Sequence, residues 1–271
     1  MGEAARMRIS EHVPEERLYP FFVRISSPWD DAQYVMAECP EHFNSDGGWI
    51  LNHRRDIVLV HQMLQPVAWE FSDDGTQAGY AYAAEDGMRL SVQLRAQDDE
   101  VRVTTEFTNG SPTAVNLLEP CFCLRLDAMG ELTTPEDKAD HLNRTFVIIG
   151  GRPVPMAEVS EGVAEAHRAA NPKRHWTGCT VRGERREPEY WWLSPSHVAD
   201  CGLIATESPA GGRWIAFAWE RTRLLFTNTQ CPCVHAQPVF DDCPPRRTVR
   251  AEGRIVFFEG TLDQLIRQRS L

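Results

Sequence analysis

The stretch RLSVQLRAQDDEVRVTTEFTNGSP, residues 89–112, decides the fold because it contains two strand patterns and two turns in direct succession. Its apolar residues alternate with polar ones, a period of two that predicts half-buried β-strands. The apolar set is Leu90, Val92, Leu94, Val101, Val103 and Phe107. QDDE at 97–100 and TNGSP at 108–112 have the composition of turns. The stretch therefore predicts a meander of antiparallel strands.

The same pattern extends over most of the chain, and long helical periodicity is nearly absent. Gly150-Gly151 and SPAGGRW at 208–214 predict hairpins. RWIAFAWE at 213–220 is apolar on both faces, which predicts a central strand. Helices are expected at 134–143, 161–170 and 261–271. Further strands are expected at 18–26, 33–38, 65–72, 77–84, 115–127, 145–149, 153–157, 176–183, 202–207, 223–228 and 249–258.

These elements predict an all-β fold, a large antiparallel two-sheet β-sandwich with a few short helices. The chain of 271 residues fits one such domain over residues 1–271, with residues 1–17 as a flexible N-terminal extension. Hydrophobic residues make up 42% and charged residues 25%, as in an ordinary soluble globular protein.

Charge and hydropathy narrow the range of partners. The net charge of −11 argues against nucleic acid, because phosphate binding needs clustered Lys and Arg. No window reaches the ~18 apolar residues of a membrane span, and the first residues do not have the pattern of a secretory signal. We therefore expect a cytoplasmic protein without a membrane partner, in which the eight cysteines are reduced thiols. A homo-oligomer is compatible with these observations.

The segment LLEPCFCLRLDAM at 117–129 predicts a strand with two unlike faces. Its apolar face carries Phe122, Leu124 and Leu126, and its polar face carries Glu119, Cys121, Cys123, Arg125 and Asp127. Carboxylates, thiols and a guanidinium on one face suit a sheet whose far side lines a cleft. The alternative is a solvated outer face on which small thiols fill space.

The stretch CPCVHAQPVFDDCPP at 231–245 raises the question of a metal site. Cys231 and Cys233 could complete a four-thiolate site with Cys121 and Cys123, but the common zinc knuckle is CxxC, not CxC. Buried reduced cysteines are the preferred interpretation, and we predict no metal and no cofactor. The prolines favour an ordered loop that holds His235 as a general acid, oriented by Asp241 or Asp242.

Other candidate residues are aromatic or basic. Trp191 and Trp192, preceded by Tyr190, could pack on the faces of sugar rings, although tryptophan also fills sandwich cores. His53 and His61 would share one face of an extended segment. GxSxG, P-loop, GxGxxG and HExxH motifs are missing from the sequence, which argues against serine hydrolases, kinases and dinucleotide oxidoreductases.

The order of these segments, with RVTTEFTNGSP at 102–112 as the clearest match, resembles the galactose-mutarotase-like β-supersandwich superfamily over roughly residues 65–260. This superfamily includes aldose 1-epimerases, polysaccharide lyases, glycoside hydrolase domains and noncatalytic modules. For an epimerase, the resemblance implies an acid and a base, for which His235 and Glu119 are the best candidates. For a lyase, it implies a base with a cation, for which His53, Tyr190 and Arg125 could serve.

We therefore expect a carbohydrate-active enzyme, an isomerase or a lyase, that binds a small sugar or an oligosaccharide in an open cleft. Its catalytic candidates are His235, Glu119, His53 and Arg125, and its substrate-binding candidates are Trp191, Trp192, His61, Tyr190 and Asp242. A noncatalytic sugar-binding or structural module is the alternative, and a Cys/His metalloprotein is the third. Fold-level analogy cannot decide among them.

Overall fold

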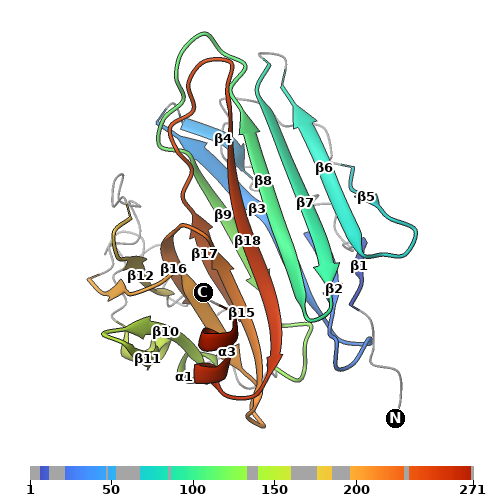
Figure 1. The fold of residues 1–271 in the computed structure, drawn as a ribbon, viewed down its shortest axis with the longest axis vertical. Coiled ribbons are helices and arrows are strands. Elements are labelled where there is room, and N and C mark those ends of the chain that lie inside the picture. Colours follow the sequence, from blue (N-terminus) through green and yellow to red (C-terminus); the bar gives the residue numbers. More distant parts are fainter. Residues whose placement is uncertain are drawn as a thin grey trace.

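The computed structural model describes residues 7–11, 22–46, 48–52, 68–84, 87–132, 140–159, 176–184, 196–228 and 232–269. Two large β-sheets face each other across one core (Figure 1). This confirms the predicted all-β, two-sheet sandwich. Within the described residues, no helix is long and apolar enough to cross a membrane.

The first sheet, called sheet A here, has the strand order β1-β2-β3-β9-β17-β16-β12-β13, with β4 paired to β3. Its described pairs are antiparallel except β12 with β13, which run parallel. The bounds are β1 Ile9–Glu11, β2 Phe22–Ser26, β3 Tyr34–Ser45, β4 Gly48–Asn52, β9 Glu119–Arg125, β12 Trp176–Val181, β13 Val198–Ala199, β16 Thr222–Asn228 and β17 Cys233–Pro238.

The second sheet, sheet B, has the order β11-β10-β14-β15-β18-β8-β7-β6-β5. The last described strand in the sequence, β18, lies in the middle of this sheet, between β15 and β8 (Figure 1). The bounds are β5 Glu70–Phe71, β6 Gln77–Ala83, β7 Arg89–Gln97, β8 Glu100–Thr108, β10 Thr145–Ile149, β11 Arg152–Pro155, β14 Leu203–Glu207, β15 Arg213–Trp219 and β18 Thr248–Glu259.

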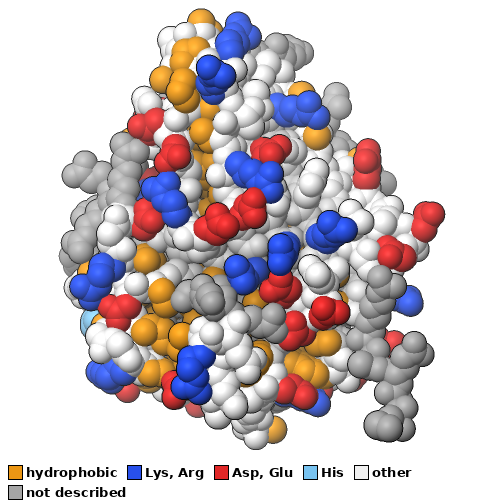
Figure 2. All heavy atoms as spheres, viewed as in Figure 1, with side chains coloured by type: hydrophobic (Ala, Val, Ile, Leu, Met, Phe, Trp, Pro, Cys, Tyr) orange, Lys and Arg blue, Asp and Glu red, His pale blue; other side chains and the backbone are white. Residues whose placement is uncertain are grey.

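The stretch 89–112 folds as its pattern predicts. β7 and β8 form a hairpin in which Gln97 pairs with Glu100 across a turn at Asp98, whose φ is 51°. After β8, the buried Asn109 organises the second turn, because its amide nitrogen donates to the carbonyl oxygens of Thr113 at 2.7 Å and Cys243 at 2.9 Å. The outward residues of these strands carry interspersed acidic and basic side chains (Figure 2).

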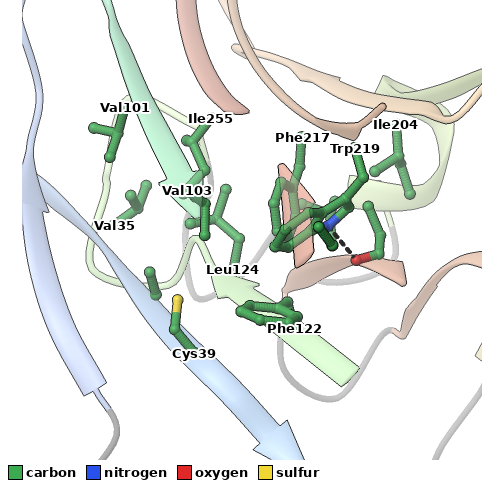
Figure 3. Close-up of a cluster of buried hydrophobic side chains, with 14 of the residues drawn as sticks. Val35, Cys39, Val101, Val103, Phe122, Leu124, Ile204, Phe217, Trp219 and Ile255 are labelled. Atoms are coloured by element: carbon green, nitrogen blue, oxygen red, sulfur yellow. Dashed lines mark hydrogen bonds between the residues drawn. The ribbon is translucent and has the colours of Figure 1, made fainter. Parts of the chain in front are cut away.

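The apolar faces of both sheets meet in the main core (Figure 3). Val35, Phe122 and Leu124 come from sheet A, and they pack toward residues of sheet B such as Val103 and Ile255. The indole nitrogen of Trp219 in β15 donates to the carbonyl oxygen of Ala236 in β17 at 2.8 Å, so a hydrogen bond also joins the two sheets. This bond holds β17 against the core.

β15 is apolar on both faces, as the sequence predicts. Ile215, Phe217 and Trp219 enter the main core, whereas Trp214, Ala216 and Ala218 belong to a second cluster on the outer face of sheet B. The helix α3, Leu262–Arg269, supplies Leu262 and Leu265 to that second cluster. The remaining described helices are α1, His141–Arg144, and the 3-10 helix η1, Met156–Glu158.

Two segments differ from the expectation at the N-terminal end. Residues 9–11, within the expected extension, form β1, which pairs with β2 and buries Ile9. The strand expected at 33–38 continues as β3 to Ser45, because a register shift between Glu38 and His42 accommodates Pro40 within the strand. The helix expected at 161–170 lies outside the described residues.

Candidate functional site

The polar face of β9 is buried. Phe122 and Leu124 enter the core, as predicted, while Glu119, Cys121 and Cys123 alternate with them and face the other side of sheet A. Glu119 is 5% exposed and Cys123 6% exposed, so this side is not a solvated outer face. Burial raises the pKa of the Cys121 thiol well above its ordinary value, and the nearby Glu41 carboxylate raises it further.

His235 lies on a strand, and the predicted loop placement is wrong. β17 pairs with β16 on one side and with β9 on the other, which makes it an interior strand of sheet A. The prolines misled the sequence interpretation because Pro232 precedes this strand and Pro238 ends it, where a missing backbone N–H costs little. His235 is therefore held by two neighbouring strands.

The imidazole of His235 has three close neighbours. Its ring stacks on Phe226 of β16, with centroids 4.0 Å apart and an interplanar angle of 7°. Its Nε2 lies 3.2 Å from Oε2 of Glu41, and its Nδ1 lies 3.8 Å from Sγ of Cys233. Burial lowers the pKa of His235, but Cys233 and the Glu41 carboxylate outweigh it and raise the pKa to about 10.

The carboxylate that contacts His235 is thus Glu41, in place of the expected Asp241 or Asp242. Asp241 instead accepts a hydrogen bond from Arg221 Nη1 at 2.7 Å. Asp242 accepts one from the backbone N–H of Leu117 at 3.2 Å.

Glu119 lies on the same face as His235. Cys123 is the direct register partner of His235, and Glu119 is four residues before Cys123 on a strand, so the three side chains share one side of the sheet. The Arg223 guanidinium forms an ion pair with Glu119 Oε1, and Asn44 Nδ2 donates to Oε2 at 3.0 Å.

Gln237 is the third polar side chain of β17 on this face, after Cys233 and His235. It is 2% exposed, and a hydrogen bond from its amide lowers the pKa of the Cys121 thiol, against the larger effect of burial. Gln237 therefore belongs to the same buried polar cluster as Cys121 and His235.

Of the remaining predicted site residues, the structure describes Arg125. Arg125 is on the polar face of β9, but it pairs with Asp127 at 2.5 Å and its guanidinium lies 5.9 Å from the ring centroid of Phe22. His53, His61, Tyr190, Trp191 and Trp192 lie outside the described residues.

Sequence reasoning missed Glu41, Arg223 and Gln237. Glu41 lies outside the strand expected at 33–38, because β3 continues to Ser45. Arg223 sits at the register irregularity between Thr222 and Leu224, which turns it out of the regular alternation. Gln237 could have been placed beside His235 from the sequence, because the two residues alternate with apolar ones if residues 233–238 are read as a strand.

Fold and site together define a two-sheet β-sandwich with a buried, charged and thiol-containing face on sheet A. No protein-family model matches this chain, and no curated protein sequence matches it significantly.

Solved structures do match. A candidate aldose 1-epimerase of Escherichia coli K12 is 9% identical, with 93% of this chain and 99% of that chain covered and a TM-score of 0.49. An aldose epimerase homologue from C. elegans is 10% identical, with 95% and 100% covered and a TM-score of 0.47. A galactose mutarotase-like protein from Clostridium acetobutylicum is 9% identical, with 94% and 99% covered and a TM-score of 0.44. The likeness to these structures concerns the fold alone.

Proposed function

We propose that this protein acts on a small sugar by acid–base chemistry, as an aldose 1-epimerase-type isomerase, with the buried polar face of sheet A as its site. The observation that supports this proposal is that His235 and Glu119, a proton donor and a carboxylate, lie on one face of sheet A. Side chains on opposite faces of a sheet could not act on one sugar.

In the proposed reaction, His235 donates a proton to the ring oxygen while Glu119 takes the proton of the anomeric hydroxyl. The bond between the anomeric carbon and the ring oxygen breaks, and a carbonyl forms at the anomeric carbon. Attack of the released hydroxyl on the other face of that carbonyl closes the ring with the opposite anomeric configuration, and both protons return.

The neighbouring side chains have roles in this proposal. Because the pKa of His235 is raised to about 10, the proton-donating form prevails at neutral pH. Glu41 orients the imidazole through the contact at Nε2.

The test is a panel of reducing sugars and uronate oligosaccharides. Anomeric exchange is followed by NMR and the formation of unsaturated products by ultraviolet absorbance. Accelerated exchange that is lost in His235→Asn and Glu119→Gln supports the proposal. Unsaturated products would instead indicate a lyase. Sugar binding without either signal would indicate a noncatalytic module, and it would refute the isomerase.

A further inference from the structure

Three potential metal ligands converge on the polar face of sheet A, and we call them the thiol–imidazole cluster. They are Cys123 of β9 and Cys233 and His235 of β17. One ligand atom from each lies within 4.8 Å of the ligand atoms of the other two, and all three residues are buried. Each of these side chains can ligate a transition metal through sulfur or nitrogen.

Strand register produces this cluster. Cys123 is directly opposite His235, and Cys233 precedes His235 by two residues on the same side of β17. Each CxC pair therefore contributes one cysteine, Cys123 from the first and Cys233 from the second. Adjacent strands lie roughly 4.8 Å apart, which brings side chains from two extended chains within reach of one ion without a zinc-knuckle turn.

The spacing within the cluster fits tetrahedral coordination. With metal–sulfur bonds of about 2.3 Å and metal–nitrogen bonds of about 2.0 Å, two ligand atoms around a tetrahedral ion lie roughly 3.5 to 3.8 Å apart. For a sulfur and a nitrogen the expected separation is about 3.5 Å, and Sγ of Cys233 and Nδ1 of His235 are 3.8 Å apart, slightly more than this. Only small side-chain shifts are needed to bind an ion between them.

The other ring nitrogen of His235 has the partner that a metal-binding histidine usually has. When Nδ1 binds a metal, Nε2 carries the hydrogen, and Glu41 Oε2 lies 3.2 Å away to accept it. Such a carboxylate fixes the tautomer and ring orientation of the ligand. Sγ of Cys121 also contacts Glu41 Oε2, at 3.7 Å, which helps to hold that carboxylate in place.

We propose that the thiol–imidazole cluster binds one zinc ion, or a cobalt ion in its place, through Cys123 Sγ, Cys233 Sγ and His235 Nδ1. Both thiols lose their protons to solvent on binding. Water or a solute takes the fourth coordination position, as in zinc sites with three protein ligands. Thiolate and imidazole ligands favour zinc over magnesium or calcium, which prefer oxygen. This proposal does not depend on the sugar chemistry.

The test uses the full-length reduced protein, made metal-free and titrated with Co²⁺ without oxygen. We expect one Co²⁺ per chain, a near-ultraviolet thiolate-to-cobalt charge-transfer band, and displacement of Co²⁺ by Zn²⁺. The band should weaken or disappear in Cys123→Ser, Cys233→Ser and His235→Gln. Glu41→Gln should lower the affinity by about 10- to 100-fold, because it removes the partner of the ligand.

Cys121→Ser is the matched control, since Cys121 is on the same strand and face as Cys123 and, with Glu41 and His235, belongs to a different potential ligand group. The band should survive in this variant. Its loss in Cys121→Ser together with its survival in Cys123→Ser would refute the assigned ligands.

X-ray absorption of the zinc-loaded wild-type protein tests the same ligands without relying on the folding of any variant. We expect two sulfur ligands and one nitrogen ligand. Failure of the folded wild-type protein to bind either ion would overturn this proposal. It would not affect the proposed isomerase activity, which is measured as anomeric exchange in the metal-free protein.

Discussion

Glu119 of β9 and Arg223 of β16 form an ion pair across the intervening strand β17. Both side chains are at most 10% exposed. Taking two charges out of water is costly, and only their mutual attraction and their hydrogen bonds compensate for it. Removal of one partner therefore leaves an uncompensated buried charge on the polar face of sheet A, which gives the first prediction.

Arg223→Met should destabilise the protein by about 3–5 kcal/mol, because the buried Glu119 loses its ion-pair partner. The double variant Arg223→Met/Glu119→Gln should recover a large part of this loss. Urea unfolding measures both. Arg250→Met is the control, because Arg250 is 51% exposed and pairs with Glu252 at 2.6 Å, and exposed pairs contribute about 0–1 kcal/mol. Equal losses in the two arginine variants would contradict the buried pair.

The second prediction concerns the proposed acid. His235→Asn should lower the rate of anomeric exchange by about 10²- to 10⁴-fold, the usual contribution of a positioned general acid. Glu41→Gln should lower kcat with little change in KM, because Glu41 orients the imidazole without binding the sugar. His197→Asn serves as the control, since His197 is outside this face and contacts Ser196. A variant at His235 with an unchanged rate would remove it from the mechanism.

The third prediction joins the two proposals. A histidine that binds a metal through Nδ1 is a neutral imidazole, so it is no longer the imidazolium that donates a proton. Zinc loading should therefore lower the rate of anomeric exchange by at least about tenfold, and a chelator should restore it. Cys123→Ser should make the exchange insensitive to zinc while retaining activity. Inhibition that persists in this variant would place the inhibiting ion elsewhere.

Sheet B could be predicted from the sequence because its signals are local. The alternation of Leu90, Val92 and Leu94 fixes the inward face of β7, and Gly150-Gly151 forms the turn between β10 and β11 with φ angles of 62° and 75°. Neither inference needs knowledge of a distant residue. The same holds for the two apolar faces of β15 and for the two faces of β9.

The candidate site could be predicted only in part because it depends on distant pairing. Glu41 and His235 are 194 residues apart in the chain, and their contact follows from the registers of β3, β9 and β17. The irregularity between Glu38 and His42 shifts one of these registers, and no local pattern reveals it. Residue type alone could select His235 and Glu119, but not their partners.

The fourth prediction concerns two neighbouring thiols of unequal reactivity. Burial raises the pKa of Cys179 to about 12, and Cys201 is only half-buried. The thiolate is the nucleophile, and its fraction falls about tenfold for each unit by which the pKa exceeds the pH. Iodoacetamide at pH 8 should therefore modify Cys201 well before Cys179, as peptide mass spectrometry would measure. Similar rates for both cysteines in the folded protein would contradict the burial of Cys179.

The last prediction returns to the turn at the end of β8. A Cβ atom added to Gly110 would overlap the backbone of Gly87, whereas one added to Gly130 would have no heavy atom within 4 Å. Backbone atoms cannot move aside as a flexible side chain can, so Gly110→Ala should destabilise the protein by about 1–3 kcal/mol or more. Gly130→Ala should stay within about 0.5 kcal/mol.

Urea unfolding of both glycine variants checks this pair, with the midpoint as the readout at unchanged slope. Because Asn109 ties this turn to the carbonyl oxygen of Cys243, the Gly110→Ala variant should also increase amide hydrogen exchange at Arg246, whose N–H donates to Asn109 O at 2.9 Å. A fully stable Gly110→Ala variant would mean that residues 87 and 110 do not approach each other, and the register of the stretch that decides the fold would then be wrong.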